Sequence, residues 1–426
     1  MKSWIRLSSL LFILIAVLSI KAEDVTILKY FQNPQPQITL KPRLTTQDRI
    51  KGHGYPAETH RTVTEDGYII TMFRIPYSHK LQNSHKYRPI VLIQHGLFSC
   101  SDAWMFNGPN DGIAFLLADA GFDVWLGNAR GNTYSRNHTS RSVNHPYFWR
   151  FSWHEIGHYD LASMIDYALA TNGQQQKAIH YVGHSQGTTA FFVLLSTRPE
   201  YNEKIKTAHM LAPVAFMNNM EDLLVRTLAP YLGHTNKYSA LFDSQEFLPY
   251  NDLFVKLGYN ACNPDSKYQN LCNSIAYLVQ GAESNSNETA FIITAQTHPA
   301  GASTNQICHY MQEQQSACFC QYDYGLVNNM QMYGQPTPPD YPVQLISAEL
   351  HLWYSDNDEM AAVEDVERLA ALLPNRIMHH MEDPSWNHGD FNTHMEVRKY
   401  LNEPMIEIMQ KYEETKEFVN LNESLE

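Results

Sequence analysis

Positive charge is scarce in this chain of 426 residues. Lysine and arginine together number 31 against 44 aspartate and glutamate residues, which gives a formal net charge of −13 with histidine neutral. The sequence also contains no basic run. Proteins that bind nucleic acid, or that dock on anionic membranes through a polybasic tract, concentrate basic charge on one face. We therefore expect no nucleic-acid partner.

Hydrophobic runs long enough to span a bilayer are missing as well. Residues 7–20 follow Lys2 and Arg6 and form an apolar run of 14 residues, short of the roughly 20 that a membrane helix needs. A short apolar run between a basic start and a small residue, here Ala22, is typical of a signal peptide. We predict a signal peptide over residues 1–22, no transmembrane segment after its removal, and a secreted protein, with a lysosomal protein as the alternative.

Cysteine is sparse. Six cysteines in 426 residues are too few for a disulfide scaffold, although export would expose them to an oxidising lumen. Cys262 and Cys272 form the best single pair, because they would close a short loop rich in polar residues. The pairing of the others stays open (Cys100, Cys308, Cys318 and Cys320). N-glycosylation sequons begin at Asn137, Asn287 and Asn422.

Strand and helix patterns alternate along most of the chain. Continuous apolar runs at residues 89–94, 122–126, 178–182 and 350–354 are typical of strands that are buried on both faces. Helical patterns follow two of these runs, at 188–196 and 363–373, and a proline stands near the end of each. The alternation predicts an α/β fold with a mostly parallel central sheet covered by helices on both faces.

The composition changes between residues 216 and 339. This region lacks β-branched runs, holds five of the six cysteines, and contains an Asn/Ser-rich stretch at 283–288 and a proline-rich turn cluster at 335–340. We predict three parts after the signal peptide. They are a first part of the core over 23–215, an insertion of mainly helices and loops over 216–339, and a second part of the core over 340–426.

Residues 183–187 fit the pattern Gly-x-Ser-x-Gly. In this pattern the serine sits on a strained turn between a strand and a helix, so that its Oγ is exposed above the sheet. The two glycines leave room for close backbone approach. A bare match arises by chance in some sequences, but here a buried strand precedes the motif and an apolar helix follows it. We predict that Ser185 is a nucleophile.

A serine nucleophile needs a base that takes its proton and an acid that orients the base. For this chain order we expect an aspartate or glutamate after a later strand, followed by a histidine. Asp358 comes just after the strand at 350–354, and His388 lies 30 residues further on. Spacing leaves other candidates open: Asp356 for the acid, and His379, His380 or His394 for the base.

Acyl transfer also needs backbone N–H groups that hold the developing oxyanion. The residue after the nucleophile, Gln186, supplies one candidate. Leu97 supplies the other, because it lies in the loop after the strand at 89–94, where Gly96 permits a tight turn. A tight turn with no catalytic part is the alternative.

Residues 154–158 match a rival motif, His-Glu-x-x-His, which on a helix binds zinc through both histidines. Gly157 weakens a helix at this place, and no third ligand stands at a usual spacing from His154 and His158. We expect no metal ion and interpret the segment as a structural turn rich in aromatic residues.

With these residues assembled, the chain resembles the acid lipase family, the group of gastric and lysosomal lipases and their secreted invertebrate relatives. The resemblance runs from Gly54 to about Tyr400. It rests on the segments 54–56, 64–70, 95–97 with Trp104, 124–132, 151–157, 183–187, 211–213, 299–301, 322–325 and 387–391.

The resemblance implies an α/β-hydrolase core with a helical cap and movable lid, which fits the insertion at 216–339. It implies Ser185, Asp358 and His388 as the catalytic residues, Leu97 and Gln186 as the oxyanion donors, and a disulfide between Cys262 and Cys272. It further implies an acid-tolerant hydrolase of lipid esters, triacylglycerol or steryl ester, that works at a lipid–water interface without a cofactor. A lipid-binding or storage protein on the same scaffold and a small-ester hydrolase are the alternatives. The oligomeric state stays open.

Overall fold

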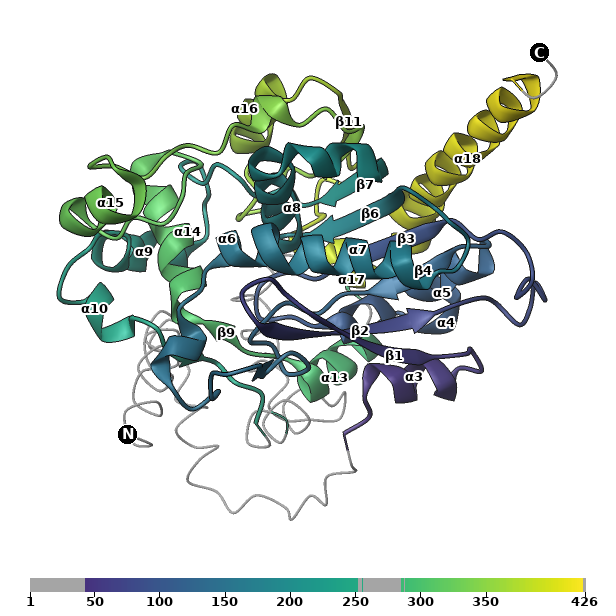
Figure 1. Cartoon of the computed structure of the whole chain (residues 1–426), viewed down its shortest axis with the longest axis horizontal. Helices are drawn as coiled ribbons and strands as arrows, with labels where there is room; N and C mark the ends of the chain where they lie inside the picture. Colours follow the sequence, from purple (N-terminus) through teal and green to yellow (C-terminus); the bar gives the residue numbers. More distant parts are fainter. Residues whose placement is uncertain (1–42, 252–254, 256–284, 287, 424–426) are drawn as a thin grey trace.

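The computed structural model describes most of the chain, namely residues 43–251, 255, 285–286 and 288–423 (Figure 1). The predicted signal peptide, the Cys262–Cys272 pair and the sequon at Asn287 lie outside the described residues. In the part that is described, no helix combines the length and the apolar character that crossing a membrane requires.

A nine-stranded sheet forms the centre of the described structure (Figure 1). Its bounds are β1 (Glu58–Val63), β2 (Tyr68–Ile75), β3 (Ile90–Gln94), β4 (Asp123–Leu126), β5 (Asn137–His138), β6 (Ile179–His184), β7 (Ile205–Leu211), β10 (Leu350–Tyr354) and β11 (Arg376–His380). The strand order is β1-β2-β4-β3-β6-β7-β10-β11, and β5 pairs with β2. All pairs from β4 to β11 are parallel, whereas β2 runs antiparallel to β1 and β4.

The central strands coincide with the apolar runs of the sequence. β3, β4 and β6 are buried along their whole length, and β10 is buried except at its last residue. A parallel strand inside a covered sheet has no solvent-facing side, so its sequence shows no polar alternation. The predicted α/β fold class with a mostly parallel sheet is confirmed.

Helices lie on both faces of this sheet. The α-helices of the core are α3 (Thr46–Gly52), α4 (Gly108–Asp111), α5 (Ile113–Asp119), α6 (Trp153–Glu155), α7 (Ala162–Thr171), α8 (Gln186–Thr197), α16 (Val363–Leu372), α17 (Asp390–Thr393) and α18 (Glu403–Glu423). Shorter helical turns are η1 (Ser101–Met105), η2 (Pro146–Trp149), η3 (Ile156–Leu161), η4 (Pro199–Lys204), η5 (Val343–Leu345) and η6 (Arg398–Asn402). α5 and α18 both contact η6 on one face, and α7 and α8 both contact η3 on the opposite face (Figure 1).

The chain between β7 and β10 is mainly helical where it is described. It contains α9 (Leu223–Leu232), α10 (Ser239–Phe242), α13 (Glu288–Thr297), α14 (Thr304–Ser316), α15 (Leu326–Tyr333) and the short strand pair β8 (Glu246–Phe247) and β9 (Ala302–Ser303). α9, α10, α14 and α15 lie together at one end of the sheet (left in Figure 1), and Leu228 and Leu232 of α9 pack against Met311 of α14. The β8–β9 strand pair was not predicted, because the sequence indicates mainly helices and loops in this region. The division into core and insertion stays a prediction.

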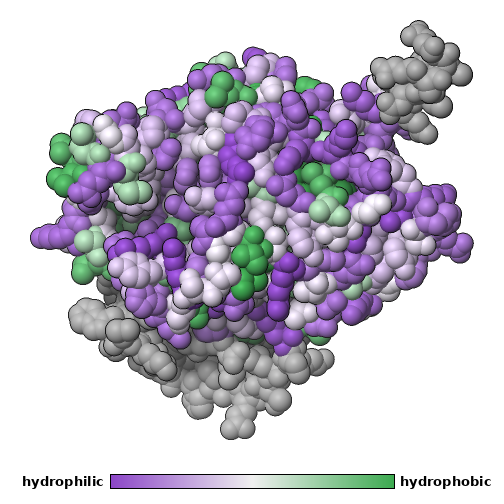
Figure 2. Space-filling view, in the orientation of Figure 1, coloured by the Kyte–Doolittle hydropathy of each residue, from purple (hydrophilic) through white to green (hydrophobic). Residues whose placement is uncertain are grey.

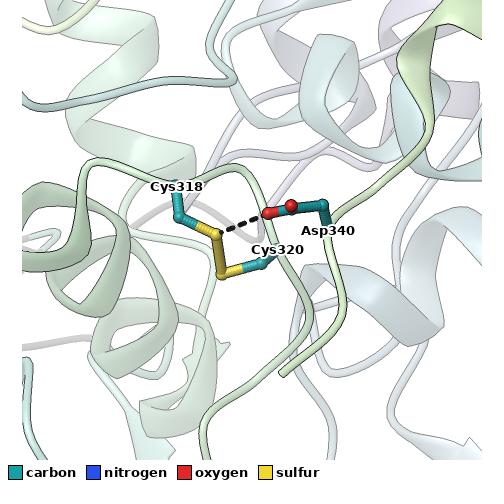
Figure 3. A group of neighbouring side chains, drawn as sticks. All are labelled: Cys318, Cys320 and Asp340. Carbon is teal, nitrogen blue, oxygen red and sulfur yellow. Dashed lines mark hydrogen bonds between the residues drawn. A yellow bond between two sulfur atoms is a disulfide. The ribbon is translucent and has the colours of Figure 1, made fainter. Parts of the chain in front are cut away.

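A disulfide joins Cys318 to Cys320 (Figure 3). From the sequence alone, the pairing of these two cysteines was open. The Cys318 sulfur lies 3.0 Å from Oδ1 of Asp340, which belongs to the segment leading into β10. Cys100 and Cys308 are buried free thiols. Burial raises the pKa of Cys308 to about 12 and that of Cys100 well above its ordinary value, so neither thiol forms the reactive thiolate at neutral pH.

Glu313 on α14 carries a buried carboxyl group whose two oxygens have no hydrogen-bond partner among the described residues. Among the described residues, Tyr310 and Tyr341 are ionisable groups close enough to interact electrostatically with it. Burial raises the pKa of Glu313 well above its ordinary value of 4.5, because apolar surroundings disfavour the charged form. The native protein therefore retains a proton that the unfolded chain releases.

We expect Glu313→Gln to stabilise the protein at pH 8 and to leave its stability at pH 4 almost unchanged. Below its unfolded-state pKa the wild-type carboxyl is neutral in both states, and as the pH rises toward its native pKa the free energy of unfolding falls. The amide cannot ionise, so the variant lacks this loss. Thermal unfolding at pH 8 should show a higher unfolding temperature for the variant than for the wild type, by about 1 °C for each kcal/mol at this chain length.

The matched control for this prediction is Glu203→Gln, which changes an exposed glutamate of η4 in the same way. Its unfolding temperature should follow that of the wild type at both pH values. A stabilisation by Glu313→Gln that is equal at pH 4 and pH 8 would contradict the role of ionisation.

Candidate active site

Ser185 occupies a strained turn between β6 and α8. Its backbone has φ 53° and ψ −121°, a conformation that residues other than glycine rarely adopt. A Cβ on Gly187 would lie 2.4 Å from the Gln94 carbonyl oxygen, and one on Gly183 would lie 2.9 Å from the Gly187 carbonyl carbon. Only glycine fits at these two positions, which explains the spacing of the motif at 183–187.

The structure brings His388 and Asp358 to this serine. His388 Nε2 lies 2.8 Å from Ser185 Oγ, and His388 Nδ1 lies 2.9 Å from both carboxylate oxygens of Asp358. Asp358 follows β10, and His388 precedes α17. A carboxylate only accepts hydrogen bonds, so Nδ1 carries the ring proton and Nε2 accepts from the Ser185 hydroxyl.

The Asp358 carboxylate is held in its charged form. Burial alone would raise its pKa, but the His388 imidazole and the backbone N–H groups of Ala361 and Met360, which donate to Oδ1 over 2.8 and 2.9 Å, hold that pKa below its ordinary value of 3.8. The charge therefore persists in acidic solution, where it can stabilise a positively charged imidazole.

The other acid and base candidates lie elsewhere. Asp356 is exposed and pairs with His380 over 2.9 Å, and His379 bonds to His351, also over 2.9 Å. The His394 ring stacks on Trp386 with ring centroids 4.2 Å apart. In the part of the chain that the structure describes, none of these alternatives forms a hydrogen bond with Ser185, so the geometry favours Asp358 and His388.

The two expected oxyanion donors flank the nucleophile. A Cβ on Gly96 would lie only 3.0 Å from Ser185 Cβ, so the loop that carries Leu97 passes directly beside the serine. Gln186 is the first residue of α8. In the described part of the chain, neither the Leu97 N–H nor the Gln186 N–H donates to an acceptor. Both N–H groups therefore remain available to a ligand.

Two buried histidines lie beside the site, and the sequence analysis assigned them no role there. His184 donates from Nε2 to the His388 carbonyl over 2.9 Å, and burial lowers its pKa to about 3, so it stays neutral. His95 donates from Nδ1 to the Gly96 carbonyl over 2.8 Å and accepts at Nε2 from the Ala129 N–H. Burial lowers its pKa to about 4. The one available signal was that both histidines stand directly beside predicted site residues.

The rival zinc motif forms α6 and the π-helical turn η3 rather than the expected loop turn. His154 bonds to the Tyr341 hydroxyl over 2.7 Å, His158 bonds to the Thr197 hydroxyl over 3.0 Å, and Glu155 accepts from the Ser152 N–H as part of a helix cap. A Cβ on Gly157 would lie 2.4 Å from the Ala190 carbonyl oxygen. The glycine thus allows η3 to pack against α8. That no metal binds here stays a prediction.

Comparisons with known proteins identify the family of this chain. The model for the alpha/beta hydrolase fold matches residues 89–391, and that for the partial alpha/beta-hydrolase lipase region matches residues 46–108. Lipase 3 of Drosophila melanogaster is 44% identical over 369 residues, which cover 86% of this chain and 93% of that protein. Gastric triacylglycerol lipase of Bos taurus is 37% identical over 384 residues, which cover 89% and 93%. Because both the family model and these relatives span most of the chain, it belongs to the acid lipase family of α/β-hydrolases and is a carboxylic ester hydrolase.

Proposed function

We propose that this enzyme hydrolyses carboxylic esters of lipids, triacylglycerol or steryl ester, through an acyl-enzyme on Ser185. The observation that carries the proposal is the hydrogen-bonded line from Ser185 Oγ to His388 Nε2, at 2.8 Å, and from His388 Nδ1 to Asp358, at 2.9 Å. The names of the gastric relatives, which specify triacylglycerol, support lipid as the substrate class.

In the first step His388 takes the Ser185 proton while Oγ attacks the ester carbonyl carbon. The carbonyl oxygen becomes an oxyanion that the N–H groups of Leu97 and Gln186 hold. His388 then gives its proton to the alcohol, which leaves as the carbon–oxygen bond breaks. Asp358 keeps the ring oriented and stabilises its charged form.

In the second step water attacks the acyl group on Ser185. His388 takes a proton from this water, and the same two N–H groups hold the second oxyanion. Collapse of the intermediate releases the carboxylic acid and returns the proton to Ser185. The two proposed steps use only these residues, the ester and water, and need no cofactor.

Exposed apolar side chains support the proposal that the enzyme acts at a lipid–water interface. Figure 2 shows hydrophobic surface at the end of the molecule where α15 lies. The exposed apolar residues of α9, α10 and α15 are Leu223, Tyr231, Leu241, Leu326, Val327, Met330 and Met332. These three helices contain no acidic residue, although the chain has a net charge of −13. Arg226 of α9 is the one charged residue in these three helices. Such a face can contact neutral lipid if the long Arg226 side chain keeps its guanidinium in water.

Secretion and glycosylation complete the proposal. Asn137 is exposed in β5, where a glycan has access, and Asn422 lies in α18 near the end of the described chain. A signal peptide at residues 1–22 would direct the chain to the secretory lumen and be removed there. The Cys318–Cys320 disulfide is stable in that oxidising compartment. A lysosomal destination is the alternative.

A lipid-binding protein would need the apolar face but not the aligned serine, histidine and aspartate. A small-ester hydrolase would need the aligned residues but not the apolar face. The molecule has both features, which favours a lipase over either alternative.

Hydrolysis of a substrate panel tests the proposal. We expect a long-chain triacylglycerol emulsion or a steryl ester to give a kcat/KM at least about 10-fold above that of a short-chain soluble ester, since each buried CH₂ adds about 0.8 kcal/mol of binding. The assay should run from pH 4 to pH 8. A fluorophosphonate probe should label Ser185, as mapped by mass spectrometry.

Labelling without turnover of any ester would favour the binding protein. A preference for the short-chain ester would favour the small-ester hydrolase.

A further inference from the structure

Residues 298–306 contact both parts of the chain that carry the proposed oxyanion donors, namely the loop after β3 and the start of α8. This 298–306 segment contains β9 and the first turn of α14, and it starts directly after α13. It lies more than a hundred residues along the chain from both Leu97 and Gln186. No sequence motif of the active site includes it.

On the Leu97 side, the 298–306 segment fixes the residue that follows the donor. The Ala300 N–H donates to the Phe98 carbonyl over 2.7 Å, and the His298 ring bonds through Nε2 to the Ser99 hydroxyl over 2.9 Å. Phe98 has a φ of 58°, a conformation that needs such support. The Thr133 N–H donates to the Ala300 carbonyl over 2.8 Å and ties the same point to the loop after β4.

On the other side, Gln306 reaches the residue that carries the second donor. Its Nε2 donates to Oε1 of the Gln186 side chain over 2.9 Å, and its own Oε1 accepts from the Ser303 N–H over 2.7 Å. Ser303 in turn donates from its hydroxyl to the Trp149 carbonyl over 2.6 Å. Gln186 and Gln306 are both buried, so water does not compete for this bond.

We propose that Gln306 is a positioning residue that, together with the rest of the 298–306 segment, fixes the spacing of the Leu97 and Gln186 N–H groups. The inference rests on the proposed function, in which these groups hold the oxyanion. Such donors act only at 2.7–3.1 Å from the charge, and a displacement of about 1 Å is enough to cost up to 100-fold in rate. The 298–306 segment thus fixes the positions of the Leu97 and Gln186 N–H groups relative to each other.

Replacement of Gln306 by methionine removes the bond to Gln186 while keeping the side-chain volume. We expect kcat to fall on the order of 10-fold, with KM within about twofold of the wild type, because the lost support matters most when the oxyanion forms. A trifluoromethyl ketone inhibitor, which adds to Ser185 and forms an oxyanion, should bind more weakly by the same factor. A soluble ester serves as the substrate, so that contact with an interface does not enter the comparison.

Gln312→Met is the matched control. Gln312 lies on the same helix and also makes two hydrogen bonds, but both go to the Asp323 backbone, with Nε2 donating over 3.0 Å and Oε1 accepting over 2.9 Å. Loss of these bonds should lower the unfolding temperature about as much as Gln306→Met does. It should leave kcat and inhibitor binding unchanged, which separates positioning from general destabilisation.

Gln186→Met removes the same hydrogen bond from its other end. We expect it to lower kcat by no more than Gln306→Met, which also loses the bond from the Ser303 N–H. The double variant should be no worse than Gln306→Met, since both changes remove the Gln186–Gln306 bond. This variant carries the test if Gln306→Met does not fold. Additive losses in the double variant would overturn the inference.

Wild-type kcat in a folded Gln306→Met protein would also overturn it, as would an equal loss in Gln312→Met. Failure of the proposed function looks different. In that case the wild-type protein itself hydrolyses no ester and the fluorophosphonate leaves Ser185 unlabelled, and the inference falls with it.

Discussion

Replacing Ser185 by alanine is expected to lower kcat for ester hydrolysis on the order of a million-fold, with the fold intact. The methyl group cannot form the acyl-enzyme, and the oxyanion donors and the bound substrate alone give only the small residual acceleration known from other serine hydrolases. Initial rates on a chromogenic ester, with thermal unfolding measured on the same samples, check this result. Near-normal hydrolysis would overturn the assignment of the nucleophile.

Ser185→Gly is the informative companion variant. It should be as inactive as Ser185→Ala but at least as stable as the wild type, because glycine adopts the φ of 53° without strain. Ser185→Ala keeps a Cβ and therefore keeps the strain. A lower unfolding temperature for the glycine variant would contradict the view that the turn at residue 185 is strained.

Asp358→Asn should lower kcat by about 10⁴-fold and leave the packing of the site unchanged. Oδ1 of Asp358 accepts the N–H groups of Met360 and Ala361, so the amide oxygen of the variant takes this place. The amide NH₂ then faces His388 Nδ1 and donates to it. The ring is left protonated at Nε2, where it cannot accept the Ser185 proton. Steady-state kinetics at the pH of maximal activity measure the effect.

Asp356→Asn is the matched control, since it makes the same change two residues away on the same loop. Among the described residues, the exposed Asp356 contacts the exposed His380 over 2.9 Å, a type of surface pair that contributes little. We expect kcat within about twofold of the wild type. A large loss in Asp356→Asn together with an active Asp358→Asn would reverse the assignment of the catalytic acid.

The sequence predicts the sheet well because burial on both faces leaves a direct record. A strand such as β3 or β6 has no solvent side, so its residues form an unbroken apolar run. The turn at Ser185 is predicted equally well, because its glycines are required by backbone contacts such as that between Gly187 and the Gln94 carbonyl. These features depend on residues close together in the chain.

The choice of acid shows where spacing stops being informative. Asp356 and Asp358 follow the same strand, and spacing from β10 does not distinguish them. What separates them is the path of the loop, which turns Asp358 toward the Met360 and Ala361 N–H groups and leaves Asp356 in solvent. The resemblance to the acid lipases supplied this choice, and the geometry agrees with it.

The sequence offers no signal for Gln306, and for His184 it offers only the place beside the predicted nucleophile. Gln306 bonds to a residue 120 positions away, and His184 bonds to a backbone carbonyl 204 positions away. A glutamine pair or a contact to a carbonyl leaves no characteristic spacing, because many residue types make such bonds. The Cys318–Cys320 disulfide was left open for a related reason, since spacing cannot rank the pairings of four cysteines.

The separation of Ser185 from His388 by 203 residues has a consequence for how the enzyme comes into being. A ribosome that has released the chain as far as β7 has already delivered Ser185, Leu97 and Gln186, but neither Asp358 nor His388. On the proposed mechanism, such a nascent chain carries a nucleophile without its base and cannot hydrolyse an ester. The same mechanism makes hydrolytic activity a late event in biosynthesis, because Asp358 follows β10 and His388 follows β11.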